Sequence, residues 1–235
     1  MRIDKLISSM GIATRREIAQ NAKRGLVLVD GVPMRDPSRH IDPEKNTVTY
    51  LGEPIRYRRF VYVMLNKPEG YVSATDDPRL PYVLELLPEC YRKMELFPVG
   101  RLDRDTTGLM ILTNNGPLAH ALLSPKHHVE KEYRFTAERE LCADAEEQFE
   151  KGITIDGGEL CKSARLVPDA DRMGGVIVLT EGKYHQIKRM LEAIGNRIVR
   201  LERICFGKIP LDPTLARGEF RELREDEIQL LENQK

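Results

Sequence analysis

The sequence predicts an α+β protein of two domains, residues 1–59 and residues 60–235. The first domain holds two helical patterns followed by short strands, and the charged segment Pro54-Ile-Arg-Tyr-Arg-Arg59 is expected to be a flexible linker after it. From Phe60 onward, short apolar runs alternate with helical patterns. The number and spacing of these runs favour a mixed α+β domain over a regular parallel βαβ array.

The helix of the first domain has a defined start and a defined end. Thr14 and Glu17 have the spacing of a capping box, in which each side chain satisfies a free backbone amide of the other residue, and Gly25 is a natural stop. Helical spacing places polar residues on one face and apolar residues on the opposite face. The polar face holds Arg16, Gln20 and Lys23, and the apolar face holds Ile18 and Ala22.

A shorter helix over residues 4–9, a strand over 26–29 that enters an Asp30-Gly31 turn, and a returning strand over 46–50 complete the first domain. The order of Arg2-Ile3-Asp4-Lys5-Leu6, Thr-Arg-Arg-Glu and Gly25-Leu-Val-Leu-Val-Asp-Gly31 resembles the small RNA-binding domain named after the fourth small-subunit ribosomal protein, here the S4-like module. A basic helical hairpin that binds a protein partner is the alternative. The resemblance implies that RNA contacts are made by Arg2, Lys5, Arg15, Arg16 and Lys23.

In the larger domain we expect strands over residues 60–65, 109–113, 131–136 and 175–180. Turns follow the first two, at Lys67-Pro-Glu-Gly70 and Asn114-Asn-Gly116. Helices are predicted over residues 117–123, 143–151, 184–194 and 225–232.

The net charge of zero hides an uneven distribution. The chain has 37 Lys and Arg against 37 Asp and Glu, but residues 1–60 hold 12 basic and 7 acidic residues, a net +5. Residues 181–209 hold 7 basic and 3 acidic, a net +4, while residues 136–160 hold 2 basic and 8 acidic. Two separated basic stretches suit a polyanion that touches the protein in two places, although such stretches are also common on solvated surfaces.

Other features narrow the class of protein. No run of eighteen apolar residues is present and the N-terminus lacks a signal-peptide core, so neither a bilayer span nor secretion is expected. The four cysteines are scattered without a Cys-x-x-Cys pair, which predicts reduced thiols in a cytoplasm. Nothing in the sequence requires a dimer, so a monomer is expected.

Residues 100–109, Gly-Arg-Leu-Asp-Arg-Asp-Thr-Thr-Gly-Leu, form a polar turn before a strong strand. Arg101-Leu-Asp-x-x-Thr-Thr-Gly-Leu resembles the catalytic motif of pseudouridine synthases, specifically the RsuA/RluB/RluE/RluF-like branch that includes the bacterial small-subunit enzyme. An S4-like module followed by this domain is the order found in that branch. The resemblance implies a mixed, mainly antiparallel sheet flanked by helices and a substrate-binding role for Arg101.

The resemblance makes Asp103 the essential carboxylate. A carboxylate is ionised at neutral pH, so it can act as a nucleophile or a base without an activating partner. The reaction breaks the bond between uracil N1 and ribose C1′ and joins C1′ to C5, and it needs no cofactor. Attack at C1′, addition to C6 and removal of a ribose proton are all compatible with the sequence. Asp105 is assigned to the turn.

Two further motifs supply the remaining candidates. In Glu130-Lys-Glu-Tyr-Arg134, strand alternation puts Lys131 and Tyr133 on one face. The family's Lys-x-Tyr motif implies that Tyr133 stacks on the flipped uracil, although a half-buried strand residue is the plainer interpretation.

In Glu181-Gly-Lys-Tyr-His-Gln-Ile-Lys-Arg-Met190, the spacing of Ile187, Met190, Leu191 and Ile194 predicts a core stripe. Lys188 lies off that stripe. The resemblance pairs Lys188 with Asp103, which should hold the carboxylate oriented and ionised. It also puts Ile187 beside the target base.

His127 and His128 make a poor metal-ligand pair, because adjacent residues of an extended segment point to opposite faces and no carboxylate follows at ligand spacing. We therefore expect no metal. The sequence predicts an isomerase that converts a uridine of 16S ribosomal RNA, or of a small-subunit assembly intermediate, to pseudouridine. Large-subunit or transfer RNA is the alternative substrate. A non-catalytic ribosome-assembly factor and a metal-dependent nuclease using Asp103 and Asp105 are the alternatives from other classes.

Overall fold

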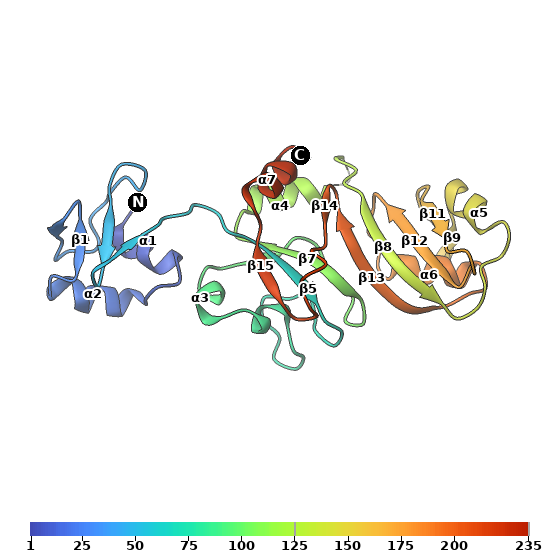
Figure 1. Cartoon of the computed structure of the whole chain (residues 1–235), viewed down its shortest axis with the longest axis horizontal. Coiled ribbons are helices and arrows are strands. Elements are labelled where there is room, and N and C mark those ends of the chain that lie inside the picture. Colours follow the sequence, from blue (N-terminus) through green and yellow to red (C-terminus); the bar gives the residue numbers. More distant parts are fainter. Residues whose placement is uncertain (125, 235) are drawn as a thin grey trace. The chain divides into compact units, whose positions relative to one another are not determined.

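The computed structural model describes residues 1–124 and 126–234 and divides into two compact units (Figure 1). The first unit is Met1–Val61 with Leu87–Phe97, and the second is Tyr62–Leu86 with Pro98–Lys235. The expected domain boundary between residues 59 and 60 stays a prediction. By packing, the first unit also takes in a segment from the middle of the chain, which includes helix α3 (Glu89–Arg92).

The helices of the first unit are α1 (Ile3–Ser9) and α2 (Arg15–Lys23). The predicted capping box is present: the Glu17 amide donates to Thr14 Oγ1 over 3.3 Å, and the Thr14 amide donates to Glu17 Oε2 over 2.8 Å. The two faces of α2 are also as predicted. Ile18 and Ala22 are fully buried, while Arg16, Gln20 and Lys23 are exposed.

The small sheet has the strand order β2-β1-β3-β4. Its strands are β1 (Val27–Val29), β2 (Val32–Pro33), β3 (Val48–Tyr50) and β4 (Glu53–Ile55). The linker prediction is wrong for its first two residues, because Pro54 and Ile55 pair with Thr49 and Val48 of β3. Proline is tolerated there because β4 is an edge strand.

The second unit is built on a mixed sheet in the order β11-β12-β8-β13-β7-β5-β15. Neighbours on this path pair antiparallel except β13 and β7, which are parallel, so the predicted mixed and mainly antiparallel sheet is confirmed. These strands are β5 (Tyr62–Lys67), β7 (Thr107–Thr113), β8 (Lys131–Ala137), β11 (Arg165–Pro168), β12 (Gly174–Leu179), β13 (Ile198–Phe206) and β15 (Phe220–Glu222).

Strand β13 occupies the middle of this sheet and was not expected from the sequence. Its segment reads Ile-Val-Arg-Leu-Glu-Arg-Ile-Cys-Phe, in which charged residues interrupt the apolar ones. Leu201, Arg203 and Phe206 are nevertheless buried. The strand brings β7 and β8 together, and these two strands and their flanking loops carry the site described below.

Helices α4 (Gly116–Leu123), α5 (Ala145–Lys151), α6 (Gln186–Ala193) and α7 (Glu225–Glu232) lie close to their predicted ranges. Helix α6 begins two residues later than predicted, because His185 has a left-handed backbone with φ of 50°. The short elements are η1 (Val83–Leu86), β6 (Phe97–Pro98), β9 (Thr154–Ile155), η2 (Asp156–Gly158), β10 (Glu159–Leu160) and β14 (Ile209–Pro210).

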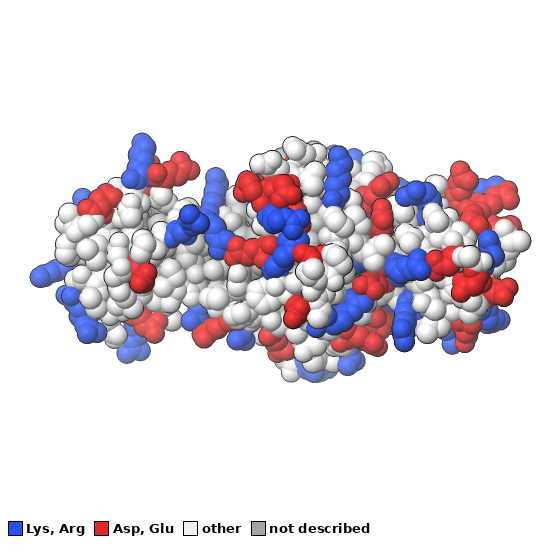
Figure 2. All heavy atoms as spheres, in the orientation of Figure 1, with Lys and Arg blue, Asp and Glu red and all other residues white. Residues whose placement is uncertain are grey.

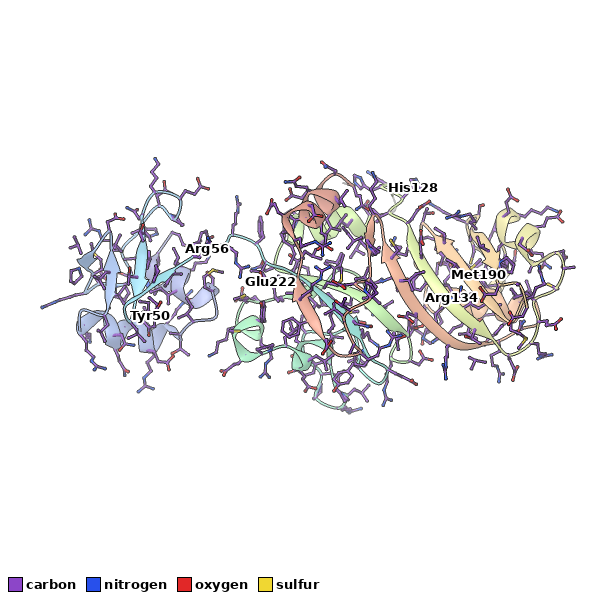
Figure 3. The ribbon with its side chains drawn as sticks, in the orientation of Figure 1. Tyr50, Arg56, His128, Arg134, Met190 and Glu222 are labelled. Atoms are coloured by element: carbon purple, nitrogen blue, oxygen red, sulfur yellow. The ribbon has the colours of Figure 1, made fainter. Side chains whose placement is uncertain are left out.

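Helices α5 and α6 share one hydrophobic core with β8, β11, β12 and β13. The predicted stripe of α6 is confirmed: Ile187, Met190 and Leu191 are buried in this core, and Ile194 packs against it. Figure 3 labels Met190 on α6 and Arg134 on β8, whose guanidinium pairs with Asp169 at 2.9 Å. The packing fixes the start of α6, and with it Lys188, relative to the sheet.

Charged side chains of both signs are interspersed over the second unit on the face drawn in Figure 2, and acidic ones gather around α5. Residues 1–60, with their net +5, belong to the first unit, and residues 181–209, with their net +4, belong to the second. Among the helices of residues 1–124 and 126–234, none is both long and apolar enough to cross a membrane.

Candidate active site

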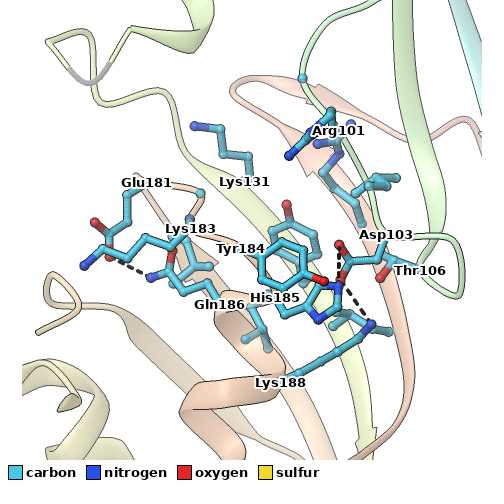
Figure 4. A pocket seen from close by; sticks show the side chains of 18 of the residues that line it. Arg101, Asp103, Thr106, Lys131, Glu181, Lys183, Tyr184, His185, Gln186 and Lys188 are labelled. Carbon is cyan, nitrogen blue, oxygen red and sulfur yellow. Dashed lines mark hydrogen bonds and ion pairs between the residues drawn. The ribbon is translucent and has the colours of Figure 1, made fainter. Parts of the chain in front are cut away.

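A pocket of about 460 Å³ opens in the second unit (Figure 4). Its wall is formed by the 100–106 turn, the start of β8, residues 179–188, and β13. The volume lies in the range of small-ligand pockets. Each of the three motifs found in the sequence contributes residues to it.

Asp103 and Lys188 form an ion pair at one end of the pocket, with Lys188 Nζ 3.0 Å from Asp103 Oδ2. The pairing that the family resemblance implied is therefore present. Their side chains are 28% and 19% exposed, so the carboxylate remains open to a ligand while the ammonium is mostly covered. Figure 4 shows Asp103 entering from the turn and Lys188 reaching it from α6.

Asp105 lies in the turn to which it was assigned, and it also pairs with Lys188. Lys188 Nζ donates to Asp105 Oδ1 over 2.5 Å, so one ammonium bridges two carboxylates. Burial acts to lower the pKa of Lys188, but its hydrogen bonds to Asp105 and Asp103 outweigh burial and hold the pKa above its ordinary value. Burial acts to raise the pKa of Asp105, but the hydrogen bond and the charge of Lys188, with smaller contributions from the turn backbone and His185, together outweigh burial and leave that pKa lowered.

The backbone of the 103–106 turn is held from below by Lys67, the last residue of β5. Lys67 is fully buried, and its Nζ lies 3.1 Å from Asp103 O, 3.3 Å from Arg104 O and 2.8 Å from Thr106 O. Burial lowers its pKa to about 8. Lys67 thus fixes the main chain from which the Asp103 side chain projects.

Tyr184 and His185 stand beside the carboxylate. Their rings stack, with centroids 3.8 Å apart, and His185 Nε2 lies 3.6 Å from Asp103 Oδ1. Tyr184 is 70% exposed, so it presents an aromatic face at the mouth of the pocket. His185 is the N-cap residue of α6 and has a left-handed backbone.

The other candidates of the second unit line the same pocket. Tyr133 is half-buried on β8, with Lys131 on the same face as predicted. Ile187 belongs to both the pocket wall and the hydrophobic core, so neither interpretation of it excludes the other. Arg101 is exposed at the rim.

The RNA-binding candidates of the first unit lie on α1 and α2 or just before them. Lys5, Arg15, Arg16 and Lys23 are exposed, and the described residues provide them with no ion pair. Arg2 differs, because its guanidinium donates to both oxygens of Asp4 over 3.0 and 2.7 Å. An arginine already paired in this way offers less to a phosphate.

Within the described part of the chain, no group of three or more His, Cys, Asp and Glu side chains is placed to hold a metal ion. Asp103 and Asp105 are instead bridged by Lys188. This arrangement leaves both carboxylates partnered by a cation of the protein itself.

Several residues of the site were not singled out from the sequence: the pocket residues Thr106, Tyr184, His185 and Arg203, and Lys67, which holds the turn that carries Asp103. Tyr184 and His185 lay within the third motif, and the resemblance gave them no role. Lys67 preceded a recognisable turn, yet a terminal lysine of a strand ordinarily reaches solvent. Arg203 belongs to the unexpected strand β13, so no signal in the sequence pointed to it.

Comparisons with known proteins agree with this geometry. Residues 61–193 match the RNA pseudouridylate synthase family, and residues 1–46 match the S4 domain. An uncharacterized RNA pseudouridine synthase, YtzG, of Bacillus subtilis is 44% identical over 98% of both chains. Ribosomal small subunit pseudouridine synthase A of Escherichia coli is 43% identical over 97% of this chain and 98% of its own.

A solved structure extends the match to three dimensions. The crystal structure of a pseudouridylate synthase, 34% identical, superposes with a TM-score of 0.70 over 98% of this chain and 99% of that one. The relatives and the solved structure match essentially the full length of the sequence, and the family model matches more than half of it. The chain belongs to the RNA pseudouridylate synthase family.

Proposed function

We propose that this protein isomerises a specific uridine of small-subunit ribosomal RNA to pseudouridine, with Asp103 as the catalytic carboxylate. The observation that carries the proposal is the Asp103–Lys188 pair inside the pocket, at 3.0 Å. A partly exposed carboxylate held by a mostly covered ammonium is a fixed and accessible group for attack or proton removal. The action takes place in the cytoplasm, on ribosomal RNA or on an assembling subunit.

The remaining pocket residues have roles that fit a single nucleotide. Tyr133 offers a ring on which the uracil stacks after it leaves its helix, and Ile187 closes the apolar side of the base. Arg101, exposed at the rim, binds the RNA as it enters. No oxidation, hydrolysis or group transfer is involved, so the residues act by orientation and charge.

The choice of small-subunit RNA is supported by the names of the relatives, and RNA binding is supported by the S4 domain of the first unit. Several relatives about 40% identical along nearly the whole chain are named ribosomal small subunit pseudouridine synthase A. We assign residues 1–59 to RNA binding and residues 60–235 to catalysis, in a monomer. Flipping a uridine costs roughly a few kcal/mol, which phosphate contacts by exposed basic residues of α2 help to offset.

The test is incubation of the purified protein with unmodified 16S RNA and with partly assembled small subunits, without added metal or cofactor, followed by chemical mapping of pseudouridine. New pseudouridine at one position of either substrate is the expected result. Large-subunit RNA and transfer RNA are run in parallel.

If only these other RNAs were modified, the proposed substrate would be wrong, but the proposed reaction would stand. RNA binding without pseudouridine in any RNA would favour the assembly-factor alternative. The Asp103→Asn variant is the control in every arm, because any pseudouridine that it forms cannot depend on the Asp103 carboxylate.

A further inference from the structure

The pocket contains two unusual polar atoms. Among the described residues, only Thr106 Oγ1 and Arg203 Nη2 are buried side-chain nitrogen or oxygen atoms without a hydrogen-bond partner. Both residues line the pocket. Unpaired buried polar atoms are rare in native proteins and call for a specific explanation.

Of these two unpaired atoms, Arg203 Nη2 is the more costly to bury because its side chain is charged. Arg203 is 2% exposed, its Nε donates to Leu109 O over 2.8 Å, and within residues 1–124 and 126–234 it has no ion pair. A buried charge without an opposite charge destabilises the folded state. The parallel pairing of β13 with β7 places the main chain of Arg203 directly against Gly108. A Cβ on Gly108 would lie 2.3 Å from Arg203 O, so only glycine allows this close approach.

Lys131 stands next to Arg203 and is also without an acidic partner in the described structure. Its Nζ lies 5.8 Å from the centre of the Phe206 ring, and the Arg203 guanidinium lies 5.4 Å from the same ring. Burial, with a smaller contribution from the charge of Arg203, lowers the pKa of Lys131 to about 8. Two cations thus flank one aromatic ring with no carboxylate between them.

This cation end of the pocket, defined by Lys131, Arg203 and Phe206, is distinct from the end where Asp103 meets Lys188. In Figure 4 the ammonium groups of Lys131 and Lys188 lie well apart, with Tyr184 and His185 drawn between them. Lys131 is only half-buried, so its ammonium is available to a ligand in the pocket. Arg203 lies deeper and adds its charge from beneath.

We propose that Lys131 and Arg203 form an anion subsite that receives a backbone phosphate of the RNA next to the target uridine. This inference rests on the proposed function. Lys131 makes the contact, and Arg203 strengthens the positive potential in a partly desolvated site. A phosphate is favoured over a neutral group because it carries a permanent negative charge, which balances the two cations as soon as the RNA binds. The nucleotide is then held at its phosphate by this end and presents its ribose to Asp103.

The experiment uses the full-length protein and an RNA fragment around the uridine that the wild-type protein is found to modify. Lys131→Met removes the charge while keeping a side chain that packs on Phe206. Lys131→Arg restores the charge. Lys162→Met is the matched control, since Lys162 is an exposed lysine of the same unit outside the pocket. Thermal unfolding shows that each variant is folded.

Each protein is measured on natural RNA and on RNA with one neutral methylphosphonate linkage, either beside the target uridine or several nucleotides away. For Lys131→Met we expect about tenfold weaker affinity and a salt slope of log K that is smaller by about 0.7. Lys131→Arg recovers the affinity and Lys162→Met leaves it unchanged. The neutral linkage beside the uridine weakens wild-type binding and has little further effect on Lys131→Met.

Two results would overturn the subsite while leaving the function intact. In the first, the wild-type protein converts the RNA, but the neutral linkage weakens RNA affinity equally in the wild-type protein and in Lys131→Met. The other is a Lys131→Met variant whose affinity and salt slope equal those of the wild type. If the wild-type protein forms no pseudouridine, the proposed function itself has failed.

Discussion

The two ends of the pocket differ in how their charges are balanced. At the carboxylate end, Asp103 and Asp105 share Lys188, and Lys67 holds the turn that carries them. At the cation end, Lys131 and Arg203 face an aromatic ring and, among the described residues, no acid. The first end is complete without a ligand, whereas the second gains an opposite charge only when something binds. The carboxylate end positions a reacting group, and the cation end attracts an anion. Substitutions at each end should therefore change different measured quantities.

Asp103→Asn tests the carboxylate end most severely. The amide keeps the shape of the side chain but can neither attack carbon nor accept a proton as a carboxylate does, so we expect the single-turnover rate to fall by roughly 10⁴-fold or more. RNA affinity should change little, because the cation end and the first unit remain. Asp105→Asn is the matched control and should lose much less. Comparable rates for the two variants would show that the wrong carboxylate was chosen.

Lys67→Met tests whether the turn beneath the carboxylate must be held rigidly. The substitution leaves several carbonyl oxygens of the turn without their buried donor, at about 1–3 kcal/mol of unfolding free energy for an unsatisfied group. We expect a lower melting temperature and a rate reduced by roughly 10²-fold, because a small misplacement of a reacting group is costly. An active variant that is merely less stable would restrict Lys67 to a structural role.

The sign of the pH dependence of stability follows from the same lysine. Burial lowers the pKa of Lys67 to about 8, below its value in the unfolded chain. Between about pH 8 and the ordinary lysine pKa near 10.4, the unfolded chain binds the proton that the folded protein has lost. The contribution of Lys67 to stability therefore rises with pH over that window, and Lys67→Met should remove this contribution.

The difference between the two ends also explains what the sequence could reveal. The stripe of Ile187, Met190 and Leu191 was readable because helical spacing alone reports it. The pairing of Asp103 with Lys188 is carried by two motifs far apart in the chain, and only the resemblance to a known family connected them. An ion pair whose two residues both lie in recognisable family motifs can therefore be predicted from the sequence.

Lys131 was found in its motif, but its proximity to a buried Arg203 could not be predicted from the sequence, for a physical reason. Charged residues in the segment of β13 hide its strand pattern, and burial of Arg203 follows from the parallel pairing of β13 with β7, which no local spacing encodes. Lys67 is similar, because its burial is produced by a turn that folds over it. Strand β4 was mistaken for a linker because Pro54 is ordinarily a poor strand residue.

A pH titration of RNA binding should separate the two ends without changing the fold. Burial lowers the pKa of Lys131 to about 8, so its ammonium loses its proton as the pH rises through that value, whereas hydrogen bonds hold the pKa of Lys188 above its ordinary value. We expect affinity to fall up to tenfold between about pH 7 and pH 9. Lys67 titrates in the same range, so Lys131→Arg, which stays charged, is the deciding variant. If the RNA affinity of Lys131→Arg fell with pH as much as that of the wild type, the fall would belong to a titrating group other than Lys131.

The smallest expected effect concerns the first unit, none of whose described residues lines the pocket. Arg16 and Lys23 are exposed on the polar face of α2 and have no ion pair among the described residues, so they are free to contact phosphates. Arg16→Gln with Lys23→Gln should weaken RNA binding several-fold and lower the salt slope by about 0.7–0.9 per lost contact, while the rate at saturating RNA stays unchanged. Arg2→Gln is an informative comparison, because Arg2 is already paired with Asp4 and its loss should change the slope less. A fall in the saturated rate would mean that the first unit orients the target as well as binding it, and the charge-only account of α2 would then be wrong.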